Sequence, residues 1–337
     1  MTAYTRPLPE LRASDADEFG GKSANLGDLL AAEIPIPSGF ALGAGAYREF
    51  VRLTGLEGTI VSALTHGEDR ASKTIGEAMR FAPLPEVVRD ELAAAYAAMD
   101  EPPVAVRSSA LGEDSSDATF AGQQESFLWV RGFDHLCDAV RDCWASLYTP
   151  RAIVYRRRLR AADTAMGVTV QQMVDAEVSG VLFTCNPVSG DPSMIAVNAS
   201  WGLGIAVVGG ETTPDDYLVS KVTGEVVRQT ISSKEIEYVP DTAGRGTVRR
   251  EVPPERRDTP CLVPERLAAL VDLGRRVENH FGSPQDVEWA IDRDGSPLVL
   301  QARPVTAMPK AASTLSGSAM SLVMGTFGVP EKDEPCR

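Results

Sequence analysis

The sequence lacks any long apolar segment. It has no run of about eighteen apolar residues, so no transmembrane helix is expected. Its N-terminus, MTAYTRPLPELRASDADEF, also lacks the apolar core of a secretory signal, and we therefore expect a cytoplasmic location and no membrane partner. With 337 residues, 43% of them hydrophobic and 24% charged, the chain is long enough for two or three packed subdomains.

Cysteines are few and scattered. Their number is odd, and no two of them form a CxxC pair. Neither a disulfide framework nor a zinc site is therefore expected. The five cysteines are Cys137, Cys143, Cys185, Cys261 and Cys336.

Basic residues are outnumbered by acidic ones. The chain has 33 Lys and Arg against 47 Asp and Glu, which gives a net charge of −14. General nucleic-acid binding needs a basic surface that displaces counterions, so no nucleic-acid partner is expected. The local run YRRRLR, Tyr155 to Arg160, is an exception that fits either the solvated face of a helix or a docking patch for an acidic partner.

The order of apolar patterns predicts an α+β fold. Residues 46–100 have mostly helical spacing, interrupted by Pro83 and Pro85, and residues 133–160 read as one or two amphipathic helices. From about Val168 the pattern becomes rich in strands, with one further helix at Pro264–Phe281. Helices and strands do not alternate regularly, which argues against a doubly wound sheet. Residues after about Pro309 read as a tail or linker.

A β-hairpin is predicted for QDVEWAIDRDGSPLVLQARPV, Gln285 to Val305, with its turn at residues 292–295. Residues two apart on a strand share a face. A register symmetric about the turn sets Glu288 opposite Gln301 and Asp286 opposite Arg303. One hairpin face would then carry two carboxylates, an amide and a guanidinium, while the other would be filled by Val287, Trp289 and Ile291.

The polar face of this hairpin has two possible explanations. Glu288 and Gln301 would supply the hard oxygen ligands that Mg²⁺ prefers, with phosphate oxygens and waters completing the shell. Arg303 would stabilise charge on a transferring phosphoryl group. The alternative is a solvent-exposed polar face that holds one salt bridge.

Three further segments combine small or apolar residues with polar groups. In GGKSANLG, Gly20 to Gly27, backbone N–H groups and Lys22 could approach a phosphate, although the segment does not match the Walker pattern and a capped helix with a surface lysine is the alternative. In AVRSSALGEDSSDATFAGQQESF, the loop after Arg107 could fold over a triphosphate or be a flexible surface loop.

The third segment is VTVQQMV, Val168 to Val174. Its residues Gln171, Gln172, Met173 and Val174 could form the edge against which an adenine lies, with backbone groups reading the purine. An ordinary core strand is the alternative, and this segment alone does not decide between them.

Together these segments resemble a known family. In this order, and with IPIPSGFAL at 34–42 and TPDDYLVSK at 213–221, they are similar to the N-terminal nucleotide-binding region of the phosphoenolpyruvate synthase and pyruvate phosphate dikinase group. The resemblance runs from about Leu11 to Thr306. It implies an ATP-grasp fold whose two α+β lobes clamp ATP and Mg²⁺, with lobes at residues 1–175 and 176–308 and a tail or linker at 309–337.

The resemblance also implies roles for single residues. Lys22 and Arg107 match the phosphate-contacting lysine and arginine, and Gly122 and Gln123 match the phosphate-covering loop. Gln171 to Val174 match the adenine-side linker. Glu288 and Gln301 match the metal-binding and catalytic pair, Arg303 matches the arginine beside the terminal phosphates, and Asp286 matches a nearby acidic position.

Two departures from the family pattern stand out. The family usually has Gly-Leu-Gly-Glu where this chain has Gly202 to Ile205, and Glu211 is the carboxylate that would have to substitute. The family also passes phosphate to a mobile histidine domain, but none of this chain's three histidines lies in such a segment. These histidines are His66, His135 and His280.

We therefore expect a split dikinase. In this interpretation the chain binds ATP, a histidine on a partner subunit attacks it to release AMP and phosphate, and the partner then phosphorylates a small acceptor. The resemblance to phenylphosphate synthase and cresol-phosphorylating systems of aromatic degradation favours a phenol or cresol as acceptor. The alternatives are the ATP-binding part of a phosphoenolpyruvate synthase or rifamycin phosphotransferase, an excised domain of a fused enzyme, and a catalytically silent nucleotide sensor.

Overall fold

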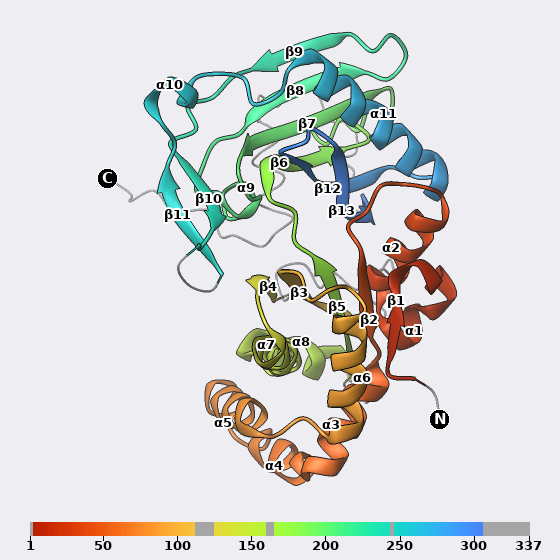
Figure 1. Ribbon diagram of the computed structural model, residues 1–337, viewed down its shortest axis with the longest axis vertical. Coiled ribbons are helices and arrows are strands. Elements are labelled where there is room, and N and C mark those ends of the chain that lie inside the picture. Colours follow the sequence, from red (N-terminus) through yellow and green to blue (C-terminus); the bar gives the residue numbers. More distant parts are fainter. Residues whose placement is uncertain (1–2, 112–124, 160–164, 243–245, 306–337) are drawn as a thin grey trace. The chain divides into compact units, whose positions relative to one another are not determined.

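The computed structural model describes residues 3–111, 125–159, 165–242 and 246–305, and these residues form two compact units (Figure 1). The first unit is built from residues up to Ala31, from Pro37–Met173 and from Asp241–Gly246. The second is built from Ala32–Ile36, Val174–Pro240 and the residues from Thr247 on. No helix among the described residues is both long and apolar enough to span a membrane.

The first unit contains a five-stranded antiparallel sheet. Its strands lie in the order β1-β2-β5-β3-β4. Their bounds are Thr5–Pro7 for β1, Gly39–Leu42 for β2, Val104–Ala110 for β3, Ser126–Val130 for β4 and Met166–Gln172 for β5. β5 is therefore the central strand, and every residue from Met166 to Gln171 is buried.

Helices make up most of the rest of the first unit. Proline and glycine set several of their limits: α3 ends at Gly55 in a left-handed conformation, and Pro85 caps the start of α6. The helices are α1 (Ala16–Phe19), α2 (Gly21–Ala31), α3 (Ala44–Thr54), α4 (Leu56–Ala63), α5 (Glu68–Phe81), α6 (Glu86–Ala97), α7 (Phe133–Ser146) and α8 (Pro150–Leu159), with single 3₁₀ turns at Leu8–Glu10 and Ala13–Asp15. The helical patterns predicted for residues 46–100 and 133–160 are confirmed.

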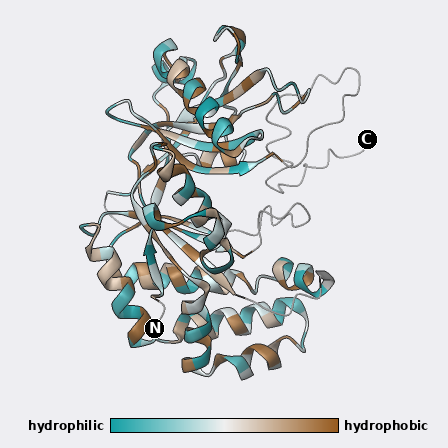
Figure 2. Cartoon of the chain, turned by 90° about the vertical axis from the view of Figure 1, so that its right-hand side faces the viewer, coloured by the Kyte–Doolittle hydropathy of each residue, from teal (hydrophilic) through white to brown (hydrophobic). Residues whose placement is uncertain are grey.

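Several helices of the first unit, such as α3 and α5, bury one face, whereas α2 is buried on nearly all sides. Figure 2 shows hydrophobic and hydrophilic residues along the same helices, as expected when one side packs and the other meets water. Trp144 is fully buried in this unit, and its ring centroid lies 5.0 Å from that of Phe50 and 5.9 Å from that of Tyr47. The hydroxyl groups of Tyr47 and Tyr148 lie 2.6 Å apart in the same core.

The described part of the arginine-rich run, Tyr155 to Leu159, lies on α8, as its helical interpretation predicts. The Arg156 guanidinium lies 4.9 Å from the centroid of the Tyr148 ring, and Arg157 forms an ion pair with Glu68. At least two of these arginines thus make contacts inside the first unit.

The second unit contains a six-stranded antiparallel sheet in the order β13-β12-β6-β7-β8-β9. The strands are β6 (Ala176–Phe183), β7 (Met194–Trp201), β8 (Asp215–Ser220), β9 (Val226–Thr230), β12 (Gln285–Asp292) and β13 (Pro297–Pro304). A separate two-stranded ribbon pairs β10 (Ile236–Pro240) with β11 (Thr247–Glu251), and the helices are α9 (Ile205–Val208), α10 (Pro254–Arg257) and α11 (Pro264–Phe281).

α11 packs on one face of this sheet (Figure 1). Gly274 permits the close approach, since a Cβ there would lie 2.8 Å from a methyl group of Leu182. Leu182 is opposite Val287, so the face that carries these two residues is the one under α11. The predicted helix Pro264–Phe281 and the predicted hairpin are both confirmed, as is the α+β class.

The division into units differs in detail from the lobes predicted at 1–175 and 176–308. The main boundary falls between Met173 and Val174, and Ala32–Ile36 belongs to the second unit. That short segment is held there through its backbone carbonyls: Val299 N–H donates to the Pro35 carbonyl at 2.9 Å, and the Arg276 guanidinium donates to the Glu33 carbonyl at 2.6 Å. Asp241–Gly246 belongs to the first unit. The predicted tail at 309–337 lies outside the described residues.

Four of the five cysteines are free and buried. Burial raises the pKa of the Cys137 thiol to about 11, and it also raises the pKa of the Cys143, Cys185 and Cys261 thiols. Thiols that resist ionisation in this way are poor nucleophiles and poor metal ligands at neutral pH.

Candidate functional site

The β12–β13 hairpin has the predicted cross-strand pairs. Glu288 lies opposite Gln301, and Asp286 lies opposite Arg303. A symmetric register does not explain these pairs, because the ladder shifts by one residue between Glu288 and Trp289. Since Trp289 faces Val299, an unshifted ladder would set Glu288 opposite Leu300. The bulge is therefore what brings the carboxylate and the amide of Gln301 together on one face.

The polar face of the hairpin is not a simple solvent-exposed surface. Val287, Trp289 and Ile291 are almost fully buried on the other face, as predicted, but Asp286 is also only 5% exposed. Glu288, Gln301 and Arg303 are half-buried. Burying several polar groups on one face is costly unless each finds a partner.

Arg303 and Asp286 form the salt bridge of this face. Arg303 Nε and Nη2 lie 2.9 Å and 2.8 Å from Asp286 Oδ2. Burial raises the pKa of the Asp286 carboxyl; the Arg303 charge and hydrogen bond oppose this shift, and the Glu288 charge adds to it. Asp286 Oδ1 is buried without a hydrogen-bond partner among the described residues. One acceptor of this face is thus left for a donor or a cation.

The oxygens of this hairpin suit a magnesium ion. Among the described residues, no group of three or more His, Cys, Asp or Glu side chains could hold a metal. A cation held by the carboxylate of Glu288 and the amide oxygen of Gln301 would therefore keep most of its ligands as waters or phosphate oxygens, which is how Mg²⁺ is usually bound beside a nucleotide. The buried Oδ1 of Asp286 fits the same need for a positive or donating group.

Lys22 is buried, which rules out the alternative of a capped helix with a surface lysine. It is the second residue of α2 and only 8% exposed, and its Nζ donates to the Ser108 carbonyl at 2.9 Å. Ser108 follows Arg107 on β3, and Arg107 is half-buried. The structure therefore brings the GGKSANLG segment and the Arg107 strand together within the first unit, 86 residues apart in sequence.

Hydroxyl groups complete this contact. Ser23 Oγ lies 2.7 Å from Thr169 Oγ1 on β5, and the Ser23 N–H donates to Ser109 Oγ at 3.4 Å. Gly20 packs directly on Ser109: its φ is +81°, and a Cβ on it would lie 2.2 Å from Ser109 Oγ and 2.3 Å from the Ser109 carbonyl oxygen. Only glycine satisfies both the backbone angle and the space.

Gly20→Ala is therefore expected to lower the free energy of unfolding by about 3 kcal/mol, from backbone strain together with overpacking. Gly132→Ala is the matched control, because Gly132 has nearly the same backbone angles (φ 80°, ψ 151°) and no atom within 4 Å of its added Cβ. Urea unfolding of both variants separates strain from contact. Equal losses in the two variants would contradict a specific role for the contact between Gly20 and Ser109.

The proposed adenine-side linker lies at the carboxyl end of β5. Gln171 is buried opposite Gly39 and Ala105, and its Nε2 has no hydrogen-bond partner among the described residues. Gln172 is exposed, and its Oε1 accepts from Ser38 Oγ at 2.7 Å. β5 is the central strand of its sheet and is buried from Met166 to Gln171, so it is a core strand. A ligand could contact it only at its carboxyl end.

The end of this linker is fixed by the backbone. Met173 N–H donates to the Pro103 carbonyl at 2.9 Å, and Val174, which is buried, begins the second unit. Gly122 and Gln123, the predicted phosphate-covering residues, lie outside the described residues.

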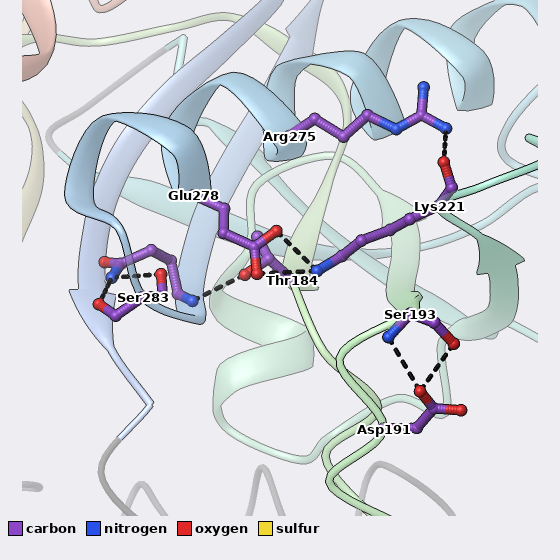
Figure 3. A network of polar contacts seen from close by, with 8 residues as sticks. Thr184, Asp191, Ser193, Lys221, Arg275, Glu278 and Ser283 are labelled. Atoms are coloured by element: carbon purple, nitrogen blue, oxygen red, sulfur yellow. Dashed lines mark hydrogen bonds and ion pairs between the residues drawn. The ribbon is translucent and has the colours of Figure 1, made fainter.

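The TPDDYLVSK segment has a structural role that its sequence did not predict. Lys221 Nζ donates to both oxygens of Glu278 on α11, at 2.8 Å and 2.6 Å, and Arg275 donates to the Lys221 carbonyl (Figure 3). The end of β8 is thereby tied to α11. Lys221 is thus held within this network.

Asp215, in the same segment, forms a fully buried ion pair. Asp215 and Lys234 are both 0% exposed, and their Oδ1 and Nζ atoms lie 2.5 Å apart. Asp215 also accepts the backbone N–H groups of Ser232 at 3.0 Å and Cys261 at 2.8 Å. Nothing in the sequence pointed to this pair, because a single lysine after two serines is typical of an exposed turn.

The sequence matches one known protein family over most of its length. The model of the pyruvate phosphate dikinase AMP/ATP-binding domain matches residues 16–320. The chain belongs to this family. The AMP/ATP-binding domain has an α+β ATP-grasp fold here, as predicted, with one large antiparallel sheet in each unit.

Curated relatives of this ATP-binding domain are named phosphoenolpyruvate synthase. The probable enzyme of Methanothermobacter thermautotrophicus is 40% identical over 97% of this chain and 50% of its own length. The probable enzyme of Archaeoglobus fulgidus is 42% identical over 90% and 42%, and the enzyme of Pyrococcus furiosus is 37% identical over 92% and 44%. The chain thus spans about half the length of the curated relatives it matches.

Among solved structures, N5-carboxyaminoimidazole ribonucleotide synthetase in its ADP complex covers 88% of this chain and 46% of its own. The two share 9% sequence identity and a TM-score of 0.36, a similarity that is too low to carry an argument.

Ile205 occupies the position where the family pattern has a glutamate, and a short helix begins there. Ile205 is the first residue of α9 and is half-buried. Glu211, the nearest candidate substitute, accepts the Tyr238 hydroxyl at 2.8 Å and lies 3.6 Å from Arg249. These contacts hold Glu211 at the β10–β11 ribbon.

Proposed function

We propose that this ATP-binding domain holds ATP with Mg²⁺ and presents the β-phosphorus of the nucleotide to an attacking histidine, which releases AMP. The observation that carries the proposal is the β12–β13 hairpin, where Glu288 opposes Gln301 and Asp286 opposes Arg303 on one half-buried face. Two oxygen ligands beside a guanidinium are what phosphoryl transfer requires, since the protein mostly positions the phosphates and stabilises their charge.

Each predicted residue has a place in this proposal. Glu288 and Gln301 hold the metal, which when bound neutralises charge on the phosphate oxygens. Arg303, fixed by Asp286, stabilises the phosphoryl group in transfer. Lys22 and Arg107 contact phosphate oxygens. Gln171 to Val174 read the base, and Gly122 and Gln123 cover the phosphates.

The attacking histidine is proposed to belong to a partner subunit or a further domain. The histidines of this chain lie at helices or beside them: His66 follows α4, His135 is in α7, and His280 is near the end of α11. His66 and His135 each place Nδ1 against a backbone carbonyl, at 3.1 Å and 2.6 Å. Neither these contacts nor their positions suit a mobile phosphate carrier.

The final acceptor is a small molecule bound by that partner. The curated relatives carry the name phosphoenolpyruvate synthase, which supports pyruvate as acceptor. The aromatic hydroxyl of a phenol or cresol remains the prediction from the resemblance to split systems. Both share the step proposed here, because the acceptor reacts only after the nucleotide has been cleaved.

The test combines this protein, the histidine-bearing partner, ATP and Mg²⁺ with pyruvate, phenol, cresol or rifamycin in turn. AMP that appears only with both proteins, in amounts that rise with one acceptor, supports the proposal and identifies the acceptor. ADP as the sole product would rule out the dikinase step. Nucleotide binding without any cleavage would instead support a nucleotide sensor.

A further inference from the structure

A row of directly opposed residues crosses the six-stranded sheet at the level of Glu288. Gln301 faces Glu288, Glu288 faces Val181, Val181 faces Asn198, and Asn198 faces Asp216. Opposed residues of antiparallel strands project from the same face of a sheet. Asn198 and Asp216 therefore share the face of the proposed metal ligands, which is the face turned away from α11.

The side-chain amide of Asn198 has a hydrogen-bond partner for its nitrogen, whereas its oxygen has none among the described residues. Its Nδ2 donates to Asp216 Oδ2 at 3.1 Å, and Arg228 donates to the other oxygen of Asp216 at 3.1 Å. Since only the amide N–H can donate to a carboxylate, these contacts fix the Asn198 oxygen as a free acceptor. Asn198 is 1% exposed, and its Oδ1 is buried without a hydrogen-bond partner among the described residues.

A buried acceptor of this kind is rare in native structures, because losing its hydrogen bond to water is costly. The partner it awaits is a cation or a group that donates an N–H or O–H. A phosphate is excluded, since its oxygens are acceptors and would be repelled by the Asn198 oxygen and by the nearby Asp216 carboxylate.

The sugar and base of the nucleotide do not suit this place either. The proposed adenine-side linker ends at Val174, and β6 starts two residues later, at Ala176. Val181, the β6 residue in the same row as Asn198, lies five residues beyond Ala176, about 16 Å along the strand, so a base at the linker would lie well away from Asn198. The remaining reactant with an N–H group is the imidazole that attacks the nucleotide.

We propose that Asn198 binds the attacking imidazole by accepting its N–H, an inference that rests on the proposed function. The other ring nitrogen uses its lone pair to form a bond to the β-phosphorus. The bond from that phosphorus to the oxygen bridging the α-phosphate breaks, and AMP leaves with this oxygen and its electron pair. No proton moves and nothing is oxidised, so the ring becomes an imidazolium whose N–H stays on the Asn198 oxygen.

The hydrogen bond strengthens as the ring becomes positive, so Asn198 favours the transition state over the ground state. It also selects the ring orientation that turns the unprotonated nitrogen towards phosphorus. Asp216 is a positioning residue: it holds the Asn198 amide and, as a carboxylate behind the N–H, makes the amide oxygen a better acceptor.

Free imidazole and 1-methylimidazole test this directly, because both have a nucleophilic nitrogen of similar basicity but only imidazole has an N–H. AMP formation from ATP and Mg²⁺ is measured with each, for the wild type and for Asn198→Leu, Asn198→Asp and Gln229→Leu. Gln229 is exposed on β9, so its variant loses an amide away from the site.

The wild type, Gln229→Leu and Asn198→Asp are expected to prefer imidazole. In Asn198→Leu the rate with imidazole should fall about tenfold to hundredfold, the value of one hydrogen bond to a charged group, to the rate with 1-methylimidazole. Binding of ATP with Mg²⁺ should be unchanged.

The failures of the two proposals are distinguishable. If the wild type forms AMP and Asn198→Leu keeps the preference, or loses rate equally with both nucleophiles, this inference alone is wrong. A variant that loses nucleotide binding or stability instead would show that Asn198 is structural and holds, for example, a buried water, which also overturns the inference. If the wild type forms AMP only with the histidine-bearing partner, Asn198→Leu must slow that reaction tenfold or more, and a smaller effect overturns this inference. If the wild type binds ATP but forms no AMP even with the partner, the proposed function fails as well.

Discussion

Replacing Glu288 with alanine is expected to lower the rate of AMP formation by about a thousandfold or more, the cost of removing a principal electrostatic contact to a transferring group. Glu288 is the anionic oxygen ligand opposite Gln301, and without it the metal has only the neutral amide from this pair. Rates measured over a series of Mg²⁺ concentrations test this. The apparent affinity for Mg²⁺ should fall together with the maximal rate.

Asp294→Ala is the control for this variant. Asp294 is an exposed carboxylate in the turn of the same hairpin, so its loss changes the local charge equally without touching the opposed pair. Its rate should stay close to that of the wild type. Activity of Glu288→Ala within a few-fold of the wild type at saturating Mg²⁺ would show that the hairpin does not hold the metal.

Replacing Lys234 with methionine is expected to destabilise the fold by about 3–5 kcal/mol, the cost of leaving a buried charge without its partner. Lys234 and Asp215 are both fully buried, and Asp215 also accepts two backbone N–H groups, so the carboxylate cannot turn away to water. Urea unfolding followed by circular dichroism measures the loss.

Lys221→Met is the matched control for this prediction. Its ion pair with Glu278 remains partly exposed, at 14% and 20% for the two side chains, so water can solvate the glutamate that is left. The loss there should be clearly smaller. Equal losses for the two variants, or a loss below about 1 kcal/mol for Lys234→Met, would contradict the account of the buried pair.

The hairpin could be predicted from sequence because its information is local. Alternation along two adjacent strands and a turn rich in Asp and Gly were enough to define both strands. The pairs Glu288–Gln301 and Asp286–Arg303 were predicted correctly, but the cause was not, since a one-residue bulge between Glu288 and Trp289 sets them. A bulge of this kind depends on how both strands pack, which the alternation alone does not show.

Contacts between distant segments could not be predicted in the same way. The burial of Lys22 against Ser108 depends on α2 lying beside β3, and the position of Asn198 relative to Glu288 depends on the register of β6 and β7. The resemblance to a family named Lys22 and Glu288 as site residues, but it gave no reason to consider Asn198 or the Asp215–Lys234 pair. Such residues become visible only when the strands are aligned.

This domain is proposed to present the β-phosphorus of ATP to a histidine, and the fate of labelled phosphate distinguishes this reaction from transfer of the γ-phosphoryl group. The protein and its histidine-bearing partner are incubated with Mg²⁺ and ATP labelled at either the β- or the γ-phosphorus. The β label is expected to become bound to the partner as acid-labile phosphohistidine, while the γ label is released as inorganic phosphate and the nucleotide product is AMP. Transfer of the γ label to the protein with formation of ADP would contradict this proposal.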